Sequence, residues 1–146
     1  MQITEVLTND FSEEILSLHM ENITIHQKER PDYYPPQNDP KAILQDFMKW
    51  KRMFILEDND KKIIGLVIFQ EKDQQKGILR INEIVIHHEY RHLWYGKLLI
   101  NFVKDRWKRN NYKKLELNCR SFNKDAQQTY YHLGMNIQRM IFECNI

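Results

Sequence analysis

The spacing of apolar residues changes along the chain, and each change predicts a new secondary-structure element. After Ser12, a residue type that favours helix N-caps, apolar residues recur at helical spacing until Arg30. The proline-rich run 31–36 excludes helix and central strand. In order, the predicted elements are a strand at 2–7, helices at 12–29 and 39–50, strands at 53–56, 63–69 and 78–86, a helix at 95–107, a strand at 115–119, a helix at 123–133 and a strand at 136–144.

This order, β-α-α-β-β-β-α-β-α-β, predicts one α/β domain over residues 1–146, in which helices cover a mixed sheet. The strands between 53 and 86 follow one another across short polar turns, which is typical of an antiparallel meander. Two helices are expected to complete the core with apolar faces. The face of the second helix ends at Trp50, and that of the helix at 95–107 includes Leu98.

The composition is that of a globular protein, because 42% of the 146 residues are hydrophobic and 29% are charged. No run approaches the ~18 apolar residues of a membrane span, and the first residues lack the features of a signal peptide. Two cysteines, Cys119 and Cys144, exclude a disulfide scaffold and a cysteine-rich zinc module. We therefore expect a cytoplasmic protein with no membrane partner.

The net charge of +2 is unevenly placed, since the segment from Arg91 to Lys114 holds eight basic residues and one acid, Asp105. This segment carries +7 and leaves −5 for the rest of the chain. A local positive field suits an anionic partner such as a phosphate, a nucleotide or a nucleic acid. A solvated helix face that keeps the protein in solution explains the same pattern equally well.

The stretch from Ile84 to Lys97 carries the clearest chemical signal. An apolar strand ends at Ile86, a polar loop follows, and the basic helix begins directly after it. The first N–H groups of a helix have no partners within the helix and attract anions, so this arrangement is a phosphate site in principle. Gly96 lets a ligand approach the backbone closely.

At these residues the chain resembles the GNAT family of acyl-CoA-dependent N-acyltransferases. The family places a hydrophobic residue, a short loop and the pattern R/Q-x-x-G-x-G/A before a helix, and Ile86, Arg91 and Gly96 stand at the matching positions. The family's second motif is matched at its expected spacings by Asn123, Ala126, Tyr130 and Gly134. Trp94 departs from the pattern because it stands at the first glycine, where its side chain either narrows the loop or points into the core.

The resemblance implies the direct attack of an amine on the thioester of acetyl-CoA, a co-substrate, without a metal. The edge of the strand would pair with the pantetheine arm, and the loop amides would hold the pyrophosphate. The residues implied for cofactor binding are Ile84, Val85, Ile86, Arg91, His92, Leu93, Trp94, Tyr95, Gly96, Lys97 and Asn123. Tyr130 stands at the general-acid position, and a phenol with a pKa near ~10 suits protonation of a departing thiolate.

Other roles for these side chains stay open. Packing in the core explains Tyr130, and capping a helix explains Asn123. Glu83 is a carboxylate in an otherwise apolar strand, which is costly unless it faces a cleft or a partner. It either serves as the general base, as a strand carboxylate near this position does in many relatives, or lies on an exposed face.

Residues that select the acceptor are expected around the proline-rich loop. The candidates are His26, Arg30, Tyr33 and Tyr34, with Asp32 beside them. Aromatic faces and acids suit a cationic amine, whereas a structural loop whose tyrosines cover the sheet explains the same residues. The compact chain favours a primary amine of a small molecule, or a protein N-terminus, as acceptor. Dimers are common in the family, so the resemblance also suggests a homodimer.

Three other functions compete with this interpretation. The run from His88 to His92 matches the H-E-x-x-H zinc-protease signature, with Glu116 as a nominal third ligand, but the strand before it predicts that the histidines span a turn. The +7 segment suits a nucleic acid, although no recognised nucleic-acid motif accompanies it. A GNAT-fold module that binds a CoA ester without turnover is the third alternative, which Trp94 favours.

Overall fold

A computed structural model describes all 146 residues of the chain. The elements are β1 (Gln2–Val6), α1 (Glu13–Glu29), α2 (Pro40–Phe47), β2 (Arg52–Glu57), β3 (Ile63–Asp73), β4 (Ile78–Ile86), the 3₁₀ turn η1 (His88–Tyr90), α3 (Tyr95–Lys108), β5 (Lys114–Leu117) and α4 (Lys124–His132). One sheet holds the five strands in sequence order. β1 to β4 pair antiparallel and β5 joins β4 in parallel, so the predicted α/β fold with a mixed sheet is confirmed. None of the helices combines the length and hydropathy that a membrane span requires.

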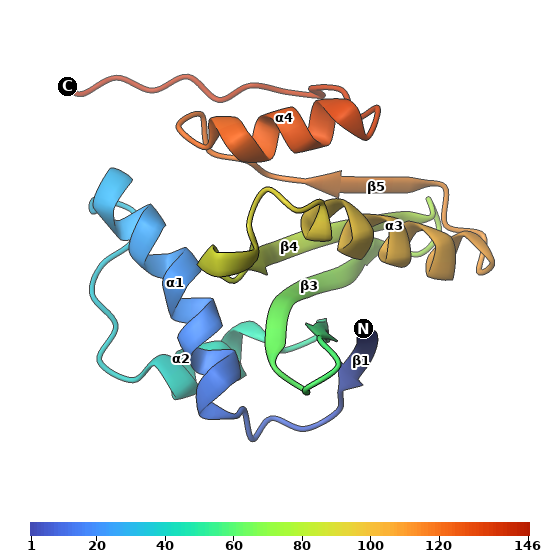
Figure 1. Cartoon of the computed structure of the whole chain (residues 1–146). Helices are drawn as coiled ribbons and strands as arrows, with labels where there is room; N and C mark the ends of the chain where they lie inside the picture. Colours follow the sequence, from blue (N-terminus) through green and yellow to red (C-terminus); the bar gives the residue numbers. More distant parts are fainter.

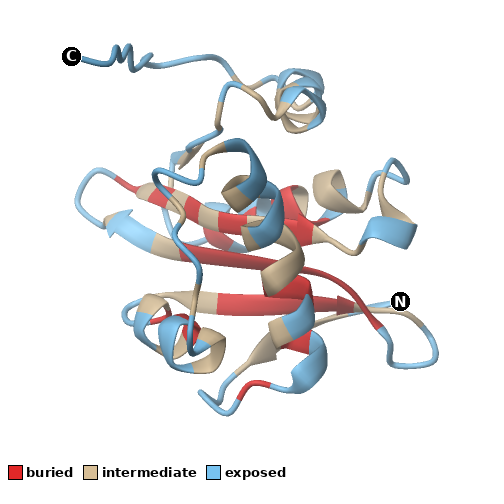
Figure 2. Ribbon diagram, turned by 90° about the vertical axis from the view of Figure 1, so that its left-hand side faces the viewer, coloured by how far each residue is buried: buried red, intermediate tan, exposed pale blue.

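Helices cover both faces of the sheet and divide the core into two clusters (Figure 1). On one face α1 and α2 bury Leu18 and Leu44 against the strands. On the other face α3 buries Val103 and Trp107, and the Trp107 indole meets the Phe69 ring edge-on at 4.6 Å. Because both faces are covered, β2 and the first part of β3 are buried at nearly every position (Figure 2).

A bulge at Asn82 interrupts the alternation of β4, so that the residues on either side of it face opposite sides of the sheet. Ile68 of β3 lies opposite Glu83 and Phe69 lies opposite Ile81, so Asn82 is an extra residue in the ladder. Ile81 therefore packs under α3, while Glu83 turns to α1 on the other face. Bulges bend a strand, and the pairing of β4 with β5 ends at Ile81, immediately before this one.

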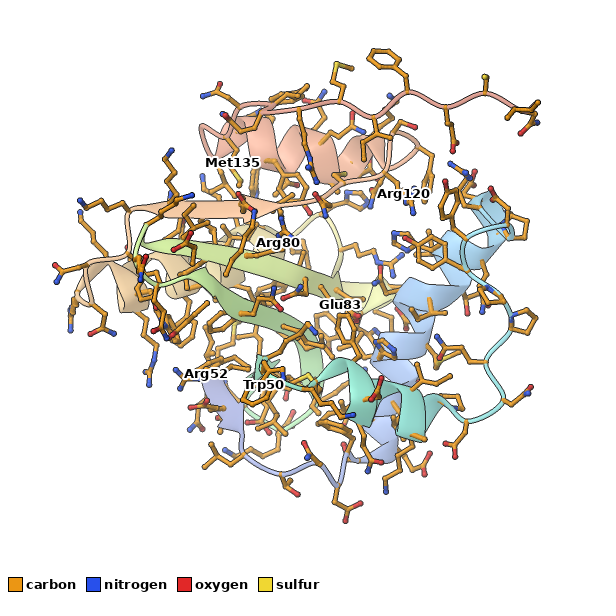
Figure 3. All side chains as sticks on the ribbon, turned by 180° about the vertical axis from the view of Figure 1, so that it is seen from behind. Trp50, Arg52, Arg80, Glu83, Arg120 and Met135 are labelled. Atoms are coloured by element: carbon orange, nitrogen blue, oxygen red, sulfur yellow. The ribbon has the colours of Figure 1, made fainter.

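The predicted strand at 136–144 does not form. The chain beyond α4 runs extended on the side of α4 that faces away from β5 (Figures 1 and 3), and every residue from 136 onward is exposed. The last backbone hydrogen bond runs from Met135 N–H to the carbonyl of Tyr130. The apolar pattern of this segment suggested a strand, but a strand also needs a neighbour, and α4 lies between the segment and the sheet edge.

Two apolar residues lie outside the faces predicted for them. α2 ends at Phe47, so Trp50 lies beyond the helix and is 96% exposed. On α3, the buried face contains Leu99, Ile100, Val103 and Trp107, and Leu98 lies at its margin and is 40% exposed. Neither difference changes the layers of the fold.

Candidate active site and cofactor loop

β4 and β5 part after a short pairing and leave one edge of β4 open. The last pair is Ile81 with Leu117, after which β5 ends. Ile84, Val85 and Ile86 keep their partners on β3, but no strand lies along their other edge. Free N–H and C=O groups at such an edge can pair with an extended ligand as if a strand were added. The structure therefore leaves this edge open where sequence analysis expected the cofactor arm.

The loop between β4 and α3 presents a continuous row of backbone donors. No acceptor in the chain takes the N–H groups of His92–Lys97, and backbone bonding resumes at Leu98, which donates to the Trp94 carbonyl over 3.1 Å. Among the predicted loop residues Arg91 differs, because its N–H donates to the His88 carbonyl. Unpaired N–H groups and the dipole of α3 together favour an anion at this position.

Trp94 adopts a backbone conformation that glycine adopts readily. Its φ is 67°, and it precedes α3 without a side-chain cap. The indole is 63% exposed, with the Lys97 ammonium 5.5 Å from its ring centroid and the His132 ring at 6.3 Å. The expectation that Trp94 points into the core is therefore wrong. A Cβ on Gly96 would meet only Ile86, at 4.0 Å, so Gly96 leaves space open beside the loop.

The Arg91 side chain fixes the loop to its surroundings. Its Nε donates to the Ile86 carbonyl over 3.0 Å, and its Nη2 donates to a Glu21 carboxylate oxygen over 3.1 Å. Glu21 lies on α1, so this contact joins the loop to the opposite layer of the fold. Sequence analysis missed Glu21 because an exposed-looking acid in a helix carries no signal of a partner 70 residues away.

Glu83 is buried, and the exposed-face alternative is wrong (Figure 3). The residue is 7% exposed, and both carboxylate oxygens lie 2.9 Å from Nδ1 of His19, which is 3% exposed. This partner offsets the cost of burying the carboxylate. Sequence analysis missed His19, although it follows Ile15 by four residues on the buried face of α1, and this spacing was the available signal.

Tyr130 extends from α4 toward the cluster under α3 and is partly buried there. Burial raises the pKa of Tyr130 well above its usual value, and the neighbouring Cys119 adds to the rise. The phenol therefore keeps its proton at neutral pH, as a general acid must. Asn123 caps α4, with its side-chain oxygen accepting the Ala126 N–H over 3.3 Å, so its capping role is observed directly.

The predicted acceptor residues come together, but their polar groups already have partners within the chain. Arg30 forms ion pairs with Asp32 at 2.7 Å and with Glu143 of the C-terminal segment at 2.6 Å. Its guanidinium also stacks 4.4 Å from the Tyr33 ring centroid. The Tyr33 hydroxyl donates to Glu143 over 3.1 Å. The charges around this loop therefore neutralise one another.

Arg120, in the loop after β5, closes this group from the other side (Figure 3). Its guanidinium lies 4.6 Å from the Tyr33 ring centroid, and its Nε donates to the Tyr34 hydroxyl over 3.2 Å. The Tyr34 ring also packs on His26, at 5.0 Å. The aromatic faces expected to receive an amine thus hold the chain's own arginines, which favours the structural-loop interpretation. Arg120 was missed because 86 residues separate it from Tyr34.

The H-E-x-x-H residues do not share a helical face. His88 lies in η1, whereas His92 has a φ of 63° and lies beyond the turn. The prediction that the two histidines span a turn is confirmed. Glu116, the nominal third ligand, forms ion pairs with Arg80 and Lys72 instead. This arrangement does not support a zinc protease.

An open strand edge, a row of free amides and a helix that begins beside them define a class of protein that binds an extended, anionic ligand at the split of a mixed sheet. The family model described as "Acetyltransferase (GNAT) family" matches residues 21–135. The chain belongs to this family of acetyltransferases.

Solved structures show the same fold at low sequence identity. A mutant of the BH1408 protein from Bacillus halodurans has a TM-score of 0.87 and 22% identity, covering 100% of this chain and 99% of that one. A ribosomal-protein-alanine N-acetyltransferase from Brucella melitensis biovar Abortus 2308 has a TM-score of 0.73 and 15% identity, with 100% of each chain covered. The putative acetyltransferase YycN from Bacillus subtilis has a TM-score of 0.71 and 16% identity, with 99% of each chain covered. No curated protein sequence matches the chain.

Proposed function

We propose that the chain is an acetyl-CoA-dependent N-acetyltransferase that acts on the primary amine of a small molecule. The observation that carries the proposal is the unpartnered run of N–H groups at His92–Lys97 beside the open edge of β4. Free N–H groups at a helix start attract anions, and a free strand edge can pair with an extended amide chain, so the two together suit a ligand with both a diphosphate and an amide arm.

The residues of the loop and the strand edge fit this co-substrate. The edge of Ile84–Ile86 would pair with the pantetheine amides, apart from the Ile86 carbonyl that accepts Arg91 Nε, and the loop amides would hold the pyrophosphate. The acetyl thioester supplies the electrophile.

Two side chains would move the protons. Glu83 accepts a proton from the attacking amine through a bridging water, since it is only 7% exposed. The amine nitrogen bonds to the carbonyl carbon, the carbon–sulfur bond breaks, and Tyr130 gives its proton to the leaving sulfur.

A small acceptor is favoured by the way the proline-rich loop is held. Arg120 and Glu143 tie this loop to the C-terminal half of the chain, which narrows the approach from the acceptor side. A folded protein would need a wider opening than a small amine does. The free state of Cys119 and Cys144 agrees with a reducing, cytoplasmic setting.

Isothermal titration with acetyl-CoA and with CoA, followed by thiol release in the presence of a panel of primary amines, tests the proposal. We expect saturable binding of both CoA species and thiol release that depends on one class of amine. Binding without release for every amine would favour a non-catalytic CoA-ester module. Failure to bind either species would contradict both functions.

A further inference from the structure

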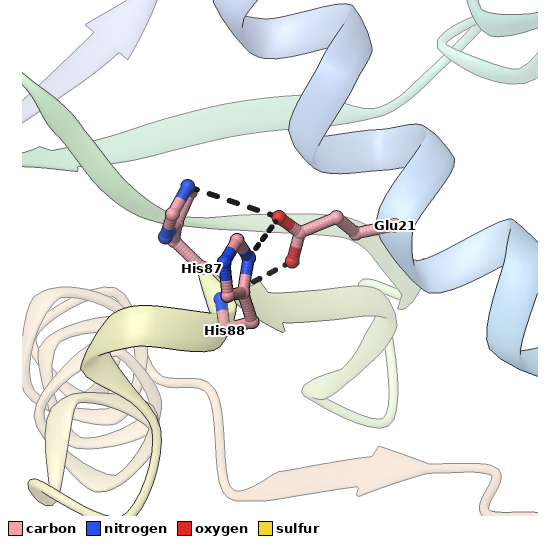
Figure 4. A group of neighbouring side chains, drawn as sticks. All are labelled: Glu21, His87 and His88. Atoms are coloured by element: carbon pink, nitrogen blue, oxygen red, sulfur yellow. Dashed lines mark hydrogen bonds and ion pairs between the residues drawn. The ribbon is translucent and has the colours of Figure 1, made fainter.

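A second polar cluster lies where α1 meets the loop after β4, outside the groups used for the proposed reaction. The carboxylate of Glu21 faces the imidazoles of His87 and His88 (Figure 4). Glu21 Oε1 lies 2.8 Å from His88 Nδ1 and 3.8 Å from His87 Nε2. The two imidazole rings stack at 4.3 Å and 26°, which turns both toward α1.

We propose that Glu21, His87 and His88 bind a divalent transition-metal ion, with Zn²⁺ as the best-matched cation. Their ligand atoms all lie within 4.8 Å of one another. Two donors at about 2.1 Å from a tetrahedral ion stand about 3.4 Å apart, and the observed 2.8 and 3.8 Å bracket this spacing. Two imidazole nitrogens and one carboxylate oxygen suit zinc and its neighbours rather than Mg²⁺ or Ca²⁺.

Groups around the cluster hold the proposed ligands in place, as they do in known metal sites. The second carboxylate oxygen of Glu21 accepts the His88 N–H over 3.2 Å and Arg91 Nη2 over 3.1 Å, which leaves Oε1 directed at the imidazoles. The other ring nitrogen of His87, Nδ1, accepts the Glu89 N–H over 3.3 Å, so an ion on Nε2 requires the ring proton to move to Nδ1, where a Glu89 carboxylate oxygen lies 3.7 Å away. Arg91 opposes a cation by its charge, and the Glu89 carboxylate already pairs with Lys62 at 2.9 Å.

The site is accessible and joins two layers of the fold. Glu21 and His87 are partly buried, and His88 is exposed, so an ion can enter from solvent. Glu21 belongs to α1, while the histidines open the loop that leads to the free amides at His92–Lys97. A bound ion would therefore strengthen the connection between α1 and this loop that His88 and Arg91 already make through Glu21. Three protein ligands leave one coordination position free for water.

The sequence pattern pointed to a different pair of ligands. H-E-x-x-H would join His88 with His92, but the His92 side chain is 75% exposed and lies near Asp125, away from Glu21. In the structure the second histidine of the cluster is His87, which precedes His88 in the chain, and the carboxylate is that of Glu21 on α1. This substitution provides a matched control, because His92 is an exposed histidine of the same loop that the proposal leaves out.

Titration of untagged, metal-free protein with Zn²⁺ by calorimetry, and with Co²⁺ by visible absorption, tests the site. We expect one ion per chain and the absorption bands of tetrahedral Co²⁺. His88→Asn and Glu21→Gln should weaken binding by more than the roughly 10–100-fold that loss of an outer-shell partner causes. Glu89→Gln should weaken it by about 10-fold. His92→Asn should bind as the parent does, and circular dichroism verifies that each variant is folded.

Three outcomes would overturn the assignment: no binding by the parent protein, binding that survives in a doubly substituted His87→Asn, His88→Asn variant, or binding lost in His92→Asn. The last result would place the ion on the H-E-x-x-H pair. Because the ion itself is the readout, these results do not depend on whether the chain transfers acetyl groups.

Discussion

Two polar regions of this molecule look similar in sequence and differ in what they leave unpaired. The loop of His92–Lys97 offers backbone N–H groups that find no acceptor in the chain. Around the proline-rich loop, Arg30, Tyr33, Tyr34 and their neighbours pair among themselves. The second region was a candidate for binding the acceptor because it is rich in aromatic and charged residues, although a structural loop explained the same residues. Hydrogen-bonding groups without a partner in the chain are the better guide to a binding site, because groups that already pair with one another are not available to a ligand.

The largest expected effect concerns Glu83, on the strand that leads to the unsaturated loop. Glu83→Gln keeps the shape and a hydrogen-bonding group beside His19 but removes the proton acceptor. We expect kcat to fall by about 10²–10⁴ while the Kd for acetyl-CoA stays unchanged. Thiol release under saturating amine measures the first quantity, and calorimetry measures the second.

Glu116→Gln is the control for this change, because Glu116 is a carboxylate of the neighbouring strand β5 that pairs with Arg80 and Lys72. It should keep activity close to that of the parent. A Glu83→Gln enzyme within about threefold of the parent rate would exclude Glu83 as the base, because general-base catalysis supplies far more than that.

Charge introduced at the loop should weaken binding of the co-substrate. Gly96→Asp places a carboxylate among the free N–H groups, where it competes with an anionic ligand for the same donors. We expect the Kd for acetyl-CoA to rise by about tenfold or more. Lys108→Glu makes a larger change of charge at the far end of α3 and should alter the Kd by less than about twofold. Equal effects of both substitutions would mean that only the overall field matters.

The saturated region should respond in stability rather than in binding. Arg120→Ala removes the stacking on Tyr33 and the hydrogen bond to Tyr34, which together contribute about 1–2 kcal/mol to the free energy of unfolding. Denaturant unfolding measures the loss, and calorimetry should give the parent's Kd for acetyl-CoA. A Kd raised by about tenfold would place this cluster in the co-substrate site and break the contrast between the two regions.

Substitutions of Asn123 can separate its two possible roles, because a helix cap affects stability whereas a cofactor contact affects acetyl-CoA binding. Asn123→Ala removes the cap on α4 and should destabilise the protein by about 1 kcal/mol. Asn123→Asp retains a capping oxygen and should restore that stability. If both variants lose acetyl-CoA binding while Asn123→Asp melts like the parent, the residue also contacts the co-substrate.

The smallest effect is a dependence of stability on alkaline pH. Because the pKa of Tyr130 is raised in the folded state, the stability it contributes is fully present below the ordinary tyrosine pKa of ~10 and is lost as pH rises toward the folded-state value. The unfolded chain releases this proton first. At about pH 10.5 the loss is about 0.8 kcal/mol, and Tyr130→Phe should remove it. Identical alkaline unfolding curves for parent and variant would show that Tyr130 is not buried as described.

Elements with a strong local pattern could be predicted from the sequence, and so could the position of the loop between β4 and α3. The strand ending at Ile86 and the helix starting at Tyr95 follow from apolar spacing, and the loop between them follows from the family pattern. The segment at 136–144 has the apolar pattern of a strand, but no strand of the sheet lies beside it. Whether a segment finds such a partner depends on the whole fold. Likewise, the partners of Glu83 and Arg91 lie 64 and 70 residues away, where no local rule reaches.

The buried side-chain oxygen of Asn82 accepts no hydrogen bond, and the proposed reaction gives this residue no role. Yet β4 without it would be an ordinary alternating strand, with Ile81, Glu83 and Ile84 each still on the face they now occupy. In genetic terms, one inserted codon distinguishes a sheet in which β4 and β5 stay paired from one in which they separate, and no side chain changes to the other face of the sheet. A chain lacking Asn82 should keep its fold and extend the β4–β5 pairing, which amide hydrogen exchange would detect. It should also bind acetyl-CoA more weakly than the parent.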